Sequence, residues 1–462
     1  MSNLSRSTAV VGLCVTALAA VAAPAGAAWT APQELPGTAG RSALFAVYGA
    51  GGATSIGMYG PLALTPGAPQ APLAISSMGA GGIHAAPAAL PDGLGAPVAV
   101  SPGGSLLAVG GPRSPLDWFS REGSRARLRV GIGPVGARLR RIPTNGIVGT
   151  RTLATAVNDS GDAAVVFSRC VNSSCSTRSV LATFRRRGRS FTAPVVLAGR
   201  TGYPAAAVAV NARGDAIVAW IQHRARGRGN DVRARMRRSD GTLTKVRLAG
   251  PTAPVPTIAV TLSRARRGVV SWFSERVGEG SVGGPLTVSW AQMDSRGAIG
   301  TRRVLDTGTP SGHGEADAVR GARLRAVFGA DGVTTFAWTG FAGGHYVVRA
   351  ERIDRDVGRV ETISPPSADA QLMDLAGDSA GDAIAVWASV PGTTTTPGVA
   401  AVIRPAGATA FGAPQLVLTG ADASGSAAGA IAPGGRAIVA GGAVEVLNRS
   451  DPPGVRVTQL LR

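Results

Sequence analysis

A short pattern recurs eight times along the chain, and its spacing constrains the fold more than any other feature of the sequence. In each copy an apolar run reaches a tight turn, and a second apolar run follows and ends in an aromatic residue or a glycine. The end points are 49 to 66 residues apart and lie at Gly57, Gly110, Phe167, Trp220, Trp272, Trp338, Trp387 and Gly441. A regular period of this length is typical of repeat architectures.

Each copy is predicted to form a β-hairpin. In the copy that ends at Trp220, the runs 207–210 and 216–220 are apolar without clean polar alternation, which is typical of strands buried on both faces. Asn211 and Gly214 take the first and fourth positions of the turn, which suits a type I turn followed by a left-handed glycine.

Some copies depart from this pattern. The turn before Trp272 has Arg266 where the other turns have glycine, and the copies that end at Gly57 and Gly110 lack the aromatic residue. Because the spacing is kept, all eight copies are counted as hairpins.

Two further strands are expected in each interval. An aromatic residue followed within three positions by Ala-Pro occurs at Trp29, Phe191 and Phe411, 28 to 30 residues before an end point. Another extended run, such as 232–236, precedes a turn at 239–241 and the strand that follows it. The predicted unit is therefore four antiparallel strands.

Four-stranded units repeated around an axis make a β-propeller. We predict an all-β fold: a single closed β-propeller over residues 28–462, with eight four-stranded antiparallel blades and seven as the alternative. The fourth-strand pattern occurs at 29–35 and again at 455–461, and one of these segments is expected to complete the closing blade of the other. A string of β-sandwiches fits the period poorly, because each sandwich needs roughly 100 residues.

Three of the turns share a longer motif. Residues 158–167, 211–220 and 378–387 follow (Asp/Asn)-x-x-Gly-(Asp/Asn)-Ala-x-x-x-Trp, with Phe167 replacing the Trp in the first copy. In this the chain resembles secreted bacterial β-propeller repeat proteins. That group is largely uncharacterised, so the resemblance implies the fold and no activity, cofactor or site residue.

The N-terminus has the pattern of a signal peptide, predicted to span residues 1–27. A basic residue precedes an apolar stretch at 9–23, and small residues at 25–27 offer a cleavage site. The mature chain is expected to start at Ala28 or Trp29 and to be secreted, extracellular or associated with the cell wall. No other segment is long and apolar enough to predict a membrane span.

Two cysteines remain in the mature chain, Cys170 and Cys175. In an exported protein this spacing favours a local disulfide over free thiols. A metal site would need further ligands, and no histidine lies nearby in the sequence.

The net charge of +20 is unevenly distributed. Residues 113–325 hold 36 basic and 13 acidic residues, whereas residues 326–462 hold 9 basic and 12 acidic residues. Because sequence order becomes angular order in a propeller, about half of the disc is expected to be basic and to attract anions.

Ten arginines are candidates for binding an anionic ligand. Those at 233, 235 and 237 alternate with apolar residues, which places them on one face of a strand. Charge there could instead protect the exposed outermost strand of a blade from pairing. Arginine also grips phosphates and carboxylates by its planar fork. The candidates are Arg185, Arg186, Arg187, Arg189, Arg224, Arg226, Arg228, Arg233, Arg235 and Arg237.

Several short motifs coincide with repeat turns or loops and are interpreted as structural. These are the G-x-S-x-G match around Ser379 and the Arg-Gly-Asp tripeptide at 213–215. The histidines are scattered and no nucleotide-binding fingerprint occurs, so no metal, cofactor or catalytic residue is assigned. The long interval before Trp338 contains a loop at 308–314 with His313, where a ligand could bind. Turn carboxylates are expected to be solvated: Asp159, Asp162, Asp215, Asp378 and Asp382.

The sequence favours an exported, non-enzymatic binding or scaffold protein. Its expected partner is an anionic polymer or a protein at the cell envelope, and a monomer is expected. Nucleic acid is not the expected natural partner, because the basic region has few aromatic residues on which bases could stack. The alternative is a propeller glycosidase or polysaccharide lyase acting on extracellular glycans, which would need two carboxylates about 5–10 Å apart at the axis.

Overall fold

The structure is a computed structural model of the chain. It describes residues 28–39, 41–48, 53–59, 74–78, 84–90, 95–110, 128–135, 137, 139–144, 151–172, 176–201, 204–223, 229–252, 257–275, 286–308, 323–329, 332–354, 358–367, 369–389, 398–420, 426–442 and 454–461. None of the described residues form a helix long and apolar enough to cross a membrane.

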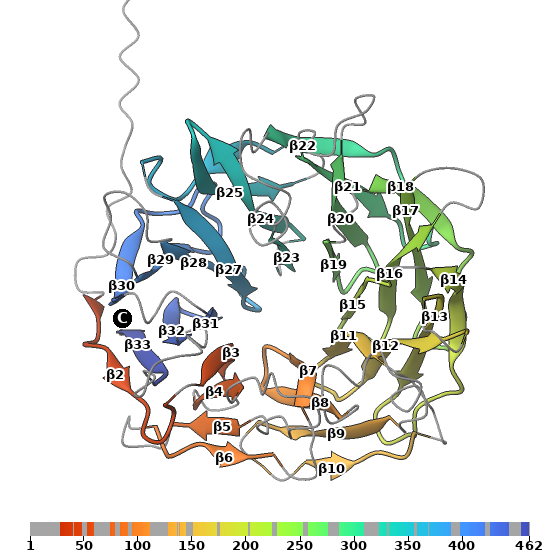
Figure 1. Ribbon diagram of the computed structural model, residues 1–462, viewed down its shortest axis with the longest axis horizontal. Helices are drawn as coiled ribbons and strands as arrows, with labels where there is room; N and C mark the ends of the chain where they lie inside the picture. Colours follow the sequence, from red (N-terminus) through yellow and green to blue (C-terminus); the bar gives the residue numbers. More distant parts are fainter. Residues whose placement is uncertain are drawn as a thin grey trace, which may run out of the picture.

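The described strands form eight antiparallel sheets arranged in a ring, each sheet being one blade (Figure 1). Blade 1 contains β3 (Ser42–Tyr48), β4 (Thr54–Tyr59), β5 (Ala74–Ser77) and β6 (Ala88–Ala89). Blade 2 contains β7 (Gly95–Val100), β8 (Ser105–Gly110), β9 (Arg129–Pro134) and β10 (Arg140–Arg141). Blade 3 contains β11 (Arg151–Val157), β12 (Ala163–Cys170), β13 (Arg178–Arg185) and β14 (Val195–Thr201). Blade 4 contains β15 (Ala206–Val210), β16 (Ala216–His223), β17 (Asn230–Arg237) and β18 (Arg247–Thr252).

The second half of the ring repeats this order. Blade 5 contains β19 (Ile258–Leu262), β20 (Gly268–Glu275), β21 (Leu286–Met293) and β22 (Arg303–Gly308). Blade 6 contains β23 (Leu324–Phe328), β24 (Thr334–Ala342), β25 (His345–Ile353) and β26 (Val360–Thr362). Blade 7 contains β27 (Ala370–Gly377), β28 (Ala383–Ser389), β29 (Gly398–Arg404) and β30 (Gln415–Thr419). Blade 8 contains β31 (Ser426–Ala432), β32 (Arg436–Gly442), β33 (Arg456–Leu461), β1 (Ala28–Trp29) and β2 (Gln33–Glu34).

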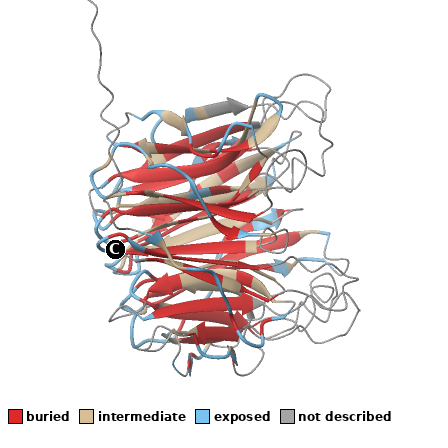
Figure 2. Ribbon diagram, turned by 90° about the vertical axis from the view of Figure 1, so that its left-hand side faces the viewer, coloured by how far each residue is buried: buried red, intermediate tan, exposed pale blue. Residues whose placement is uncertain are grey.

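The prediction of a single closed eight-bladed propeller is confirmed. All eight end points of the repeat lie on the second strand of a blade, and the first strand of each blade is the innermost (Figure 1). Buried strand interiors run through the thickness of the disc, and exposed residues gather in the turns at its two faces (Figure 2).

The second strands are apolar throughout because both of their faces are buried. In β12, Val165 and Phe167 pack toward Leu107 of blade 2, whereas Val166 packs toward Val218 of blade 4. The other aromatic end points likewise pack against the preceding blade and are almost fully buried. Each aromatic end point therefore joins one blade to the blade before it.

Blade 1 lacks the aromatic residue at Gly57 and compensates for it locally. A Cβ at Gly57 would overlap the ring of Phe45, which comes from the inner strand β3 of the same blade. The aromatic volume is kept, but another strand supplies it.

The N-terminal segment closes the ring. Trp29 pairs with Leu460, and Gln33 pairs with Val457, so β1 and β2 form the outer edge of the sheet that ends the chain. One of the two end segments was expected to complete the closing blade, and the N-terminal one does so. The segment at 455–461 is its third strand and not a fourth strand, because β33 pairs with β32 on its other side.

The closure is fixed by buried contacts as well as by strand pairing. Leu35 is almost fully buried, and its backbone N donates to the carbonyl O of Val455 at 2.8 Å. The buried hydroxyl of Thr38 accepts from the backbone N of Val455 at 2.9 Å and donates to the carbonyl O of Leu35 at 2.6 Å.

A chain that starts at residue 40 should therefore be several kcal/mol less stable than one that starts at residue 28, because it loses Leu35 and leaves β33 unpaired on its outer side. Urea unfolding followed by tryptophan fluorescence measures the difference. A synthetic peptide of residues 28–39 should restore stability in trans. Equal stability of the two chains would show that the seam contributes nothing.

Candidate functional site

The turns within each blade gather at one end of the ring. Because antiparallel strands reverse at every turn, the turn between the first and second strands lies at the same end as the turn between the third and fourth. In blade 4, Asp215 of the first turn accepts a hydrogen bond at Oδ1 from the backbone N of Ser239 in the second turn, at 2.8 Å. We call this end of the ring the turn face.

The same carboxylate contact recurs in two other blades. Oδ1 of Asp162 accepts from the backbone N of Arg187 at 2.8 Å, and Oδ1 of Asp382 accepts from the backbone N of Ala406 at 2.7 Å. Asp215 is fully buried, and Asp162 and Asp382 are nearly so. The aspartate that follows the turn glycine therefore ties the two turns of a blade together.

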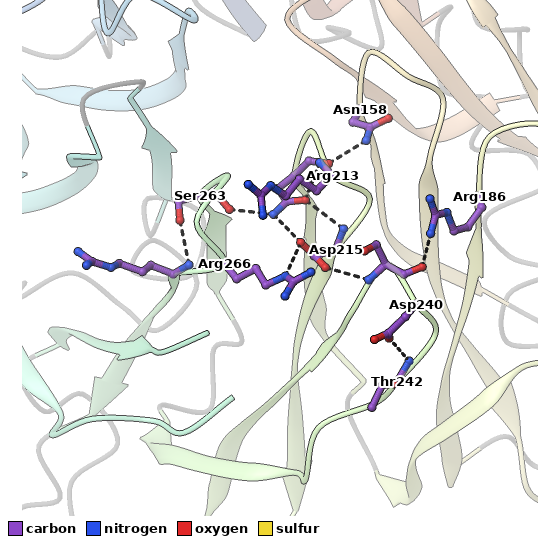
Figure 3. A network of polar contacts seen from close by, with 11 residues as sticks. Asn158, Arg186, Arg213, Asp215, Asp240, Thr242, Ser263 and Arg266 are labelled. Atoms are coloured by element: carbon purple, nitrogen blue, oxygen red, sulfur yellow. Dashed lines mark hydrogen bonds and ion pairs between the residues drawn. The ribbon is translucent and has the colours of Figure 1, made fainter. Parts of the chain in front are cut away.

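Asparagine side chains join the turns of successive blades. Nδ2 of Asn158 in blade 3 donates to the carbonyl O of Asn211 in blade 4 at 2.7 Å. Nδ2 of Asn211 donates in turn to the carbonyl O of Ser263 in blade 5 at 2.8 Å (Figure 3). Both asparagines are buried, so these bonds are protected from water.

Arg266 occupies the left-handed turn position at which other blades have glycine. Its φ of 65° is left-handed, which is unfavourable for a residue with a side chain. Nε of Arg266 lies 3.0 Å from Oδ2 of Asp215 in the neighbouring blade (Figure 3). Burial alone raises the pKa of Asp215, but hydrogen bonds from Ser239, Arg266 and Asn211 outweigh it and hold that pKa below its usual value. The aspartate is therefore ionised and binds Arg266.

The turns of blades 3 to 5 expose more positive than negative charge. Three exposed aspartates, Asp159, Asp240 and Asp294, each accept backbone N–H hydrogen bonds. The side chain of Arg186 also reaches across to the carbonyl O of Ser239 in blade 4 (Figure 3). The exposed arginines of these turns are Arg186, Arg187, Arg189, Arg213, Arg264, Arg267 and Arg296.

Two of the ten candidate arginines are buried and hold the scaffold together. Nη1 of Arg185 donates to the carbonyl O of Gly161, in the other turn of its blade. The guanidinium of Arg237 lies 5.0 Å from the ring centroid of Phe184 in blade 3. Burial lowers the pKa of both side chains, which nevertheless stay charged because arginine starts so high.

The remaining candidates are divided. The strand β17 that carries Arg233 and Arg235 is the third of its blade and not the outermost, so edge protection is the wrong interpretation for them. Both are half-buried, and Arg235 donates to the carbonyl O of Thr244. Arg186, Arg187 and Arg189 are brought together at the turn face. Arg224, Arg226 and Arg228 lie outside the described residues.

The motifs at the turns have structural roles. Burial of Asp215 keeps the Arg-Gly-Asp tripeptide from presenting its carboxylate, and Ser379 lies in the turn after β27. Solvation is the wrong expectation for four of the five turn carboxylates, since only Asp159 is exposed. The sequence does carry a signal for this burial, since aspartate follows the turn glycine in three copies, at 162, 215 and 382. A position open to solvent would not need the same residue each time. Among the described residues no group of three or more His, Cys, Asp or Glu could hold a metal ion.

Some predicted features cannot be placed. Cys170 ends β12, but Cys175 lies outside the described residues, so the disulfide stays a prediction. The loop after Gly308 with His313 also lies outside them. The inner strands, within the described ranges, carry one carboxylate, Asp374 on β27.

Comparison with known proteins finds no family and only distant structural similarities. No protein-family model matches the sequence, and none of the curated proteins matches it. The β-propeller domain of the Trilobed protease from Pyrococcus furiosus is 10% identical with a TM-score of 0.45, covering 82% of this chain and 96% of that one. The Dos1 propeller is 11% identical with a TM-score of 0.46, covering 94% and 95%. The phage phi92 endosialidase is 10% identical with a TM-score of 0.39, covering 94% and 69%. These are similarities of fold alone.

Blade 7 carries an aspartate where blades 3 and 4 carry the asparagine that joins blades. Oδ1 of Asp378 accepts three backbone N–H bonds from its own turn, while its buried Oδ2 has no hydrogen-bond partner among the residues that the structure describes. In blade 3 the corresponding Nδ2 of Asn158 lies 3.0 Å from Oδ2 of Asp162. Burial, and then the negative charge of Asp382, raise the pKa of Asp378.

Asp378→Asn should therefore stabilise the protein by about 1–2 kcal/mol at pH 8. A raised carboxyl pKa gives stability that is full in acid and is lost as the pH rises, so the gain should shrink toward pH 4. Urea unfolding across this pH range measures it. Asn158→Asp, which creates the same acid pair in blade 3, should have the opposite effect. A variant no more stable than the parent at pH 8 would refute the argument.

Proposed function

We propose that the protein is an exported, non-enzymatic binding protein whose basic turn face, on blades 3 to 5, binds an anionic polymer of the cell envelope. One observation carries the proposal: seven exposed arginines lie on adjacent turns of three successive blades. The exposed aspartates among them are engaged with backbone N–H groups and compete only weakly for the guanidinium groups.

The scaffold beneath these arginines supports binding. The backbone at Arg187 is held by Asp162, and that at Ser239 is held by Asp215. Turns fixed before binding lose little conformational freedom on binding, which favours affinity. Arginine can grip successive phosphate or carboxylate groups through two parallel hydrogen bonds each.

This face suits a polymer bound through the charged groups of its backbone better than a nucleic acid bound through its bases. Phe167, Trp220 and Trp272 are fully buried, and the other described phenylalanine and tryptophan residues of these blades are buried as well. None of the three can serve as a stacking platform for a base.

Export is part of the proposal and rests on the pattern of residues 1–27 and on the resemblance to secreted propeller repeat proteins. N-terminal sequencing of the protein recovered from a bacterial culture tests it.

The binding test uses long-chain polyphosphate and alginate as phosphate and carboxylate probes. Changing Arg186, Arg187 and Arg189 together to serine should weaken binding several-fold and reduce the slope of log affinity against log salt by about 1 per lost contact. Fluorescence anisotropy of labelled polymer between low and high salt measures both. The fold should be unchanged, because these side chains are exposed.

A matched control removes the same charge elsewhere. Arg169 lies on the second strand of its blade, and Arg200 and Arg247 lie on outer strands; all three are exposed. Changing these three to serine should alter binding much less. If both triple variants bind equally, net charge and not the turn face is responsible. If the parent protein binds neither polymer at low salt, the proposal fails.

A further inference from the structure

Blade 1 carries a buried histidine at a position where other blades carry an apolar residue. His84 forms an isolated bridge near the end of the third strand of its blade, as Phe191, Leu243 and Ile299 do in blades 3, 4 and 5. Those three side chains pack into the core that their blade shares with the preceding one. For blade 1 the preceding blade is blade 8, which it meets where the ring closes (Figure 1).

The hydrogen-bond partners of His84 confirm that it faces this closure. Its partner Thr54 lies on the same face of β4 as Ile56 and Met58, because side chains alternate along a strand. Ile56 and Met58 pack against Val457 of blade 8. His84 is 2% exposed, so it is buried in the interface that joins the last blade to the first.

Both ring nitrogens of His84 lie beside hydroxyl groups. Nδ1 is 3.4 Å from Oγ of Ser76, and Nε2 is 3.4 Å from Oγ1 of Thr54. The hydroxyl of Ser76 donates to the carbonyl O of Ala85 at 2.6 Å, so it accepts from Nδ1, and Nε2 is left to accept from Thr54. This pattern uses the neutral ring. A second ring proton would cancel the bond that Thr54 donates.

Blade 1 offers no negative charge to a protonated His84. Residues 42–90 contain no Asp, Glu, Lys or Arg. Tyr48 pairs with Thr54, and burial raises the pKa of this tyrosine to about 12, so it stays neutral. A charge on His84 would therefore be buried without a counter-ion, which is costly.

Blade 8 does not supply a counter-ion either. Its Arg436 lies with its guanidinium 5.9 Å from the ring centroid of Tyr48, and this positive charge opposes a second one on His84. Glu34 pairs with Arg456, whose side chain donates to a carbonyl of blade 7. Residues directly opposite share a face, so Glu34 lies on the side of the sheet turned away from blade 1.

The closure therefore requires a neutral His84. Burial lowers the pKa of this histidine, so an opened interface binds the proton more readily than a closed one. The stability that the neutral ring provides is full above about pH 6.5 and is lost as the pH falls below that value. We propose that His84 is an acid-sensitive latch, whose protonation loosens the interface between blades 8 and 1 in weak acid. The latch is independent of the polymer-binding turn face.

Other groups with shifted pKa values act in the opposite direction. Burial raises the pKa of four carboxyls in blades 6 and 7, and a carboxyl with a raised pKa stabilises the fold more as the pH falls. These carboxyls are Glu351, Glu361, Asp374 and Asp378. Loosening of the closure in weak acid would therefore not come from them.

Hydrogen exchange measured by mass spectrometry at pH 7 and pH 5, corrected for the intrinsic rate of each amide, tests the proposal. The backbone N–H groups of Leu35 and Val455 report on the closure, and those of β16 report on blade 4. Exchange at the closure should rise by up to about tenfold for each pH unit below 6.5, while β16 stays unchanged. No change at the closure, or an equal change in β16, would overturn the proposal.

Two variants remove the titrating group. His84→Phe installs the residue that blade 3 has at this position, and His84→Gln keeps a polar side chain beside the two hydroxyls. Either should abolish the rise in exchange between pH 7 and pH 5. His223→Gln removes an exposed histidine at the end of β16 and should respond to acid as the parent does. If both variants at position 84 keep the acid response of the parent, the latch is refuted, whatever the outcome for the polymers.

Discussion

The geometry of the turn face depends on a buried carboxylate that joins two turns of one blade. Asp215 accepts hydrogen bonds from Ser239, Asn211 and Arg266, and these come from both turns of its own blade and from the next blade. Burying a charge is costly unless it is fully hydrogen-bonded, and here both oxygens are used. Because the bonds are directional, they fix the position of each turn. The backbone of the exposed arginines on these turns is therefore held in place.

The sequence predicted the fold because the repeat satisfies the same physical demand in every blade. A second strand buried between two neighbours must be apolar on both faces, and this leaves a visible run that ends at residues such as Trp220. The roles of the third and fourth strands at the seam were harder to predict. A ring can be closed from either end, and only the pairing of β33 with both β32 and β1 shows that the N-terminal segment lies outside.

The sequence identified the arginines of the candidate site, but it did not show which of them are exposed. Arg185 and Arg186 are neighbours in the sequence, yet Arg185 is buried against the carbonyl of Gly161 and Arg186 is exposed. Successive side chains point to opposite sides of a strand, so a run of arginines that crosses a strand end is divided between scaffold and surface. Which arginines are buried and which are exposed depends on the residue at which β13 ends. The composition of the run does not predict that residue.

Each departure from the repeat can be explained by the contact that takes the place of the usual residue. The missing aromatic at Gly57 is replaced by Phe45, and the missing glycine at Arg266 is offset by an ion pair with Asp215. The departure at Arg325 is matched by Asp374 at the same level of the next blade: burial raises the pKa of that carboxyl, and the positive charge of Arg325 opposes the rise. An alanine satisfies the packing there in three other blades, so packing does not require an arginine. An arginine and an aspartate that replace alanine at one level of two adjacent blades are best explained by each other, as opposite charges on neighbouring inner strands.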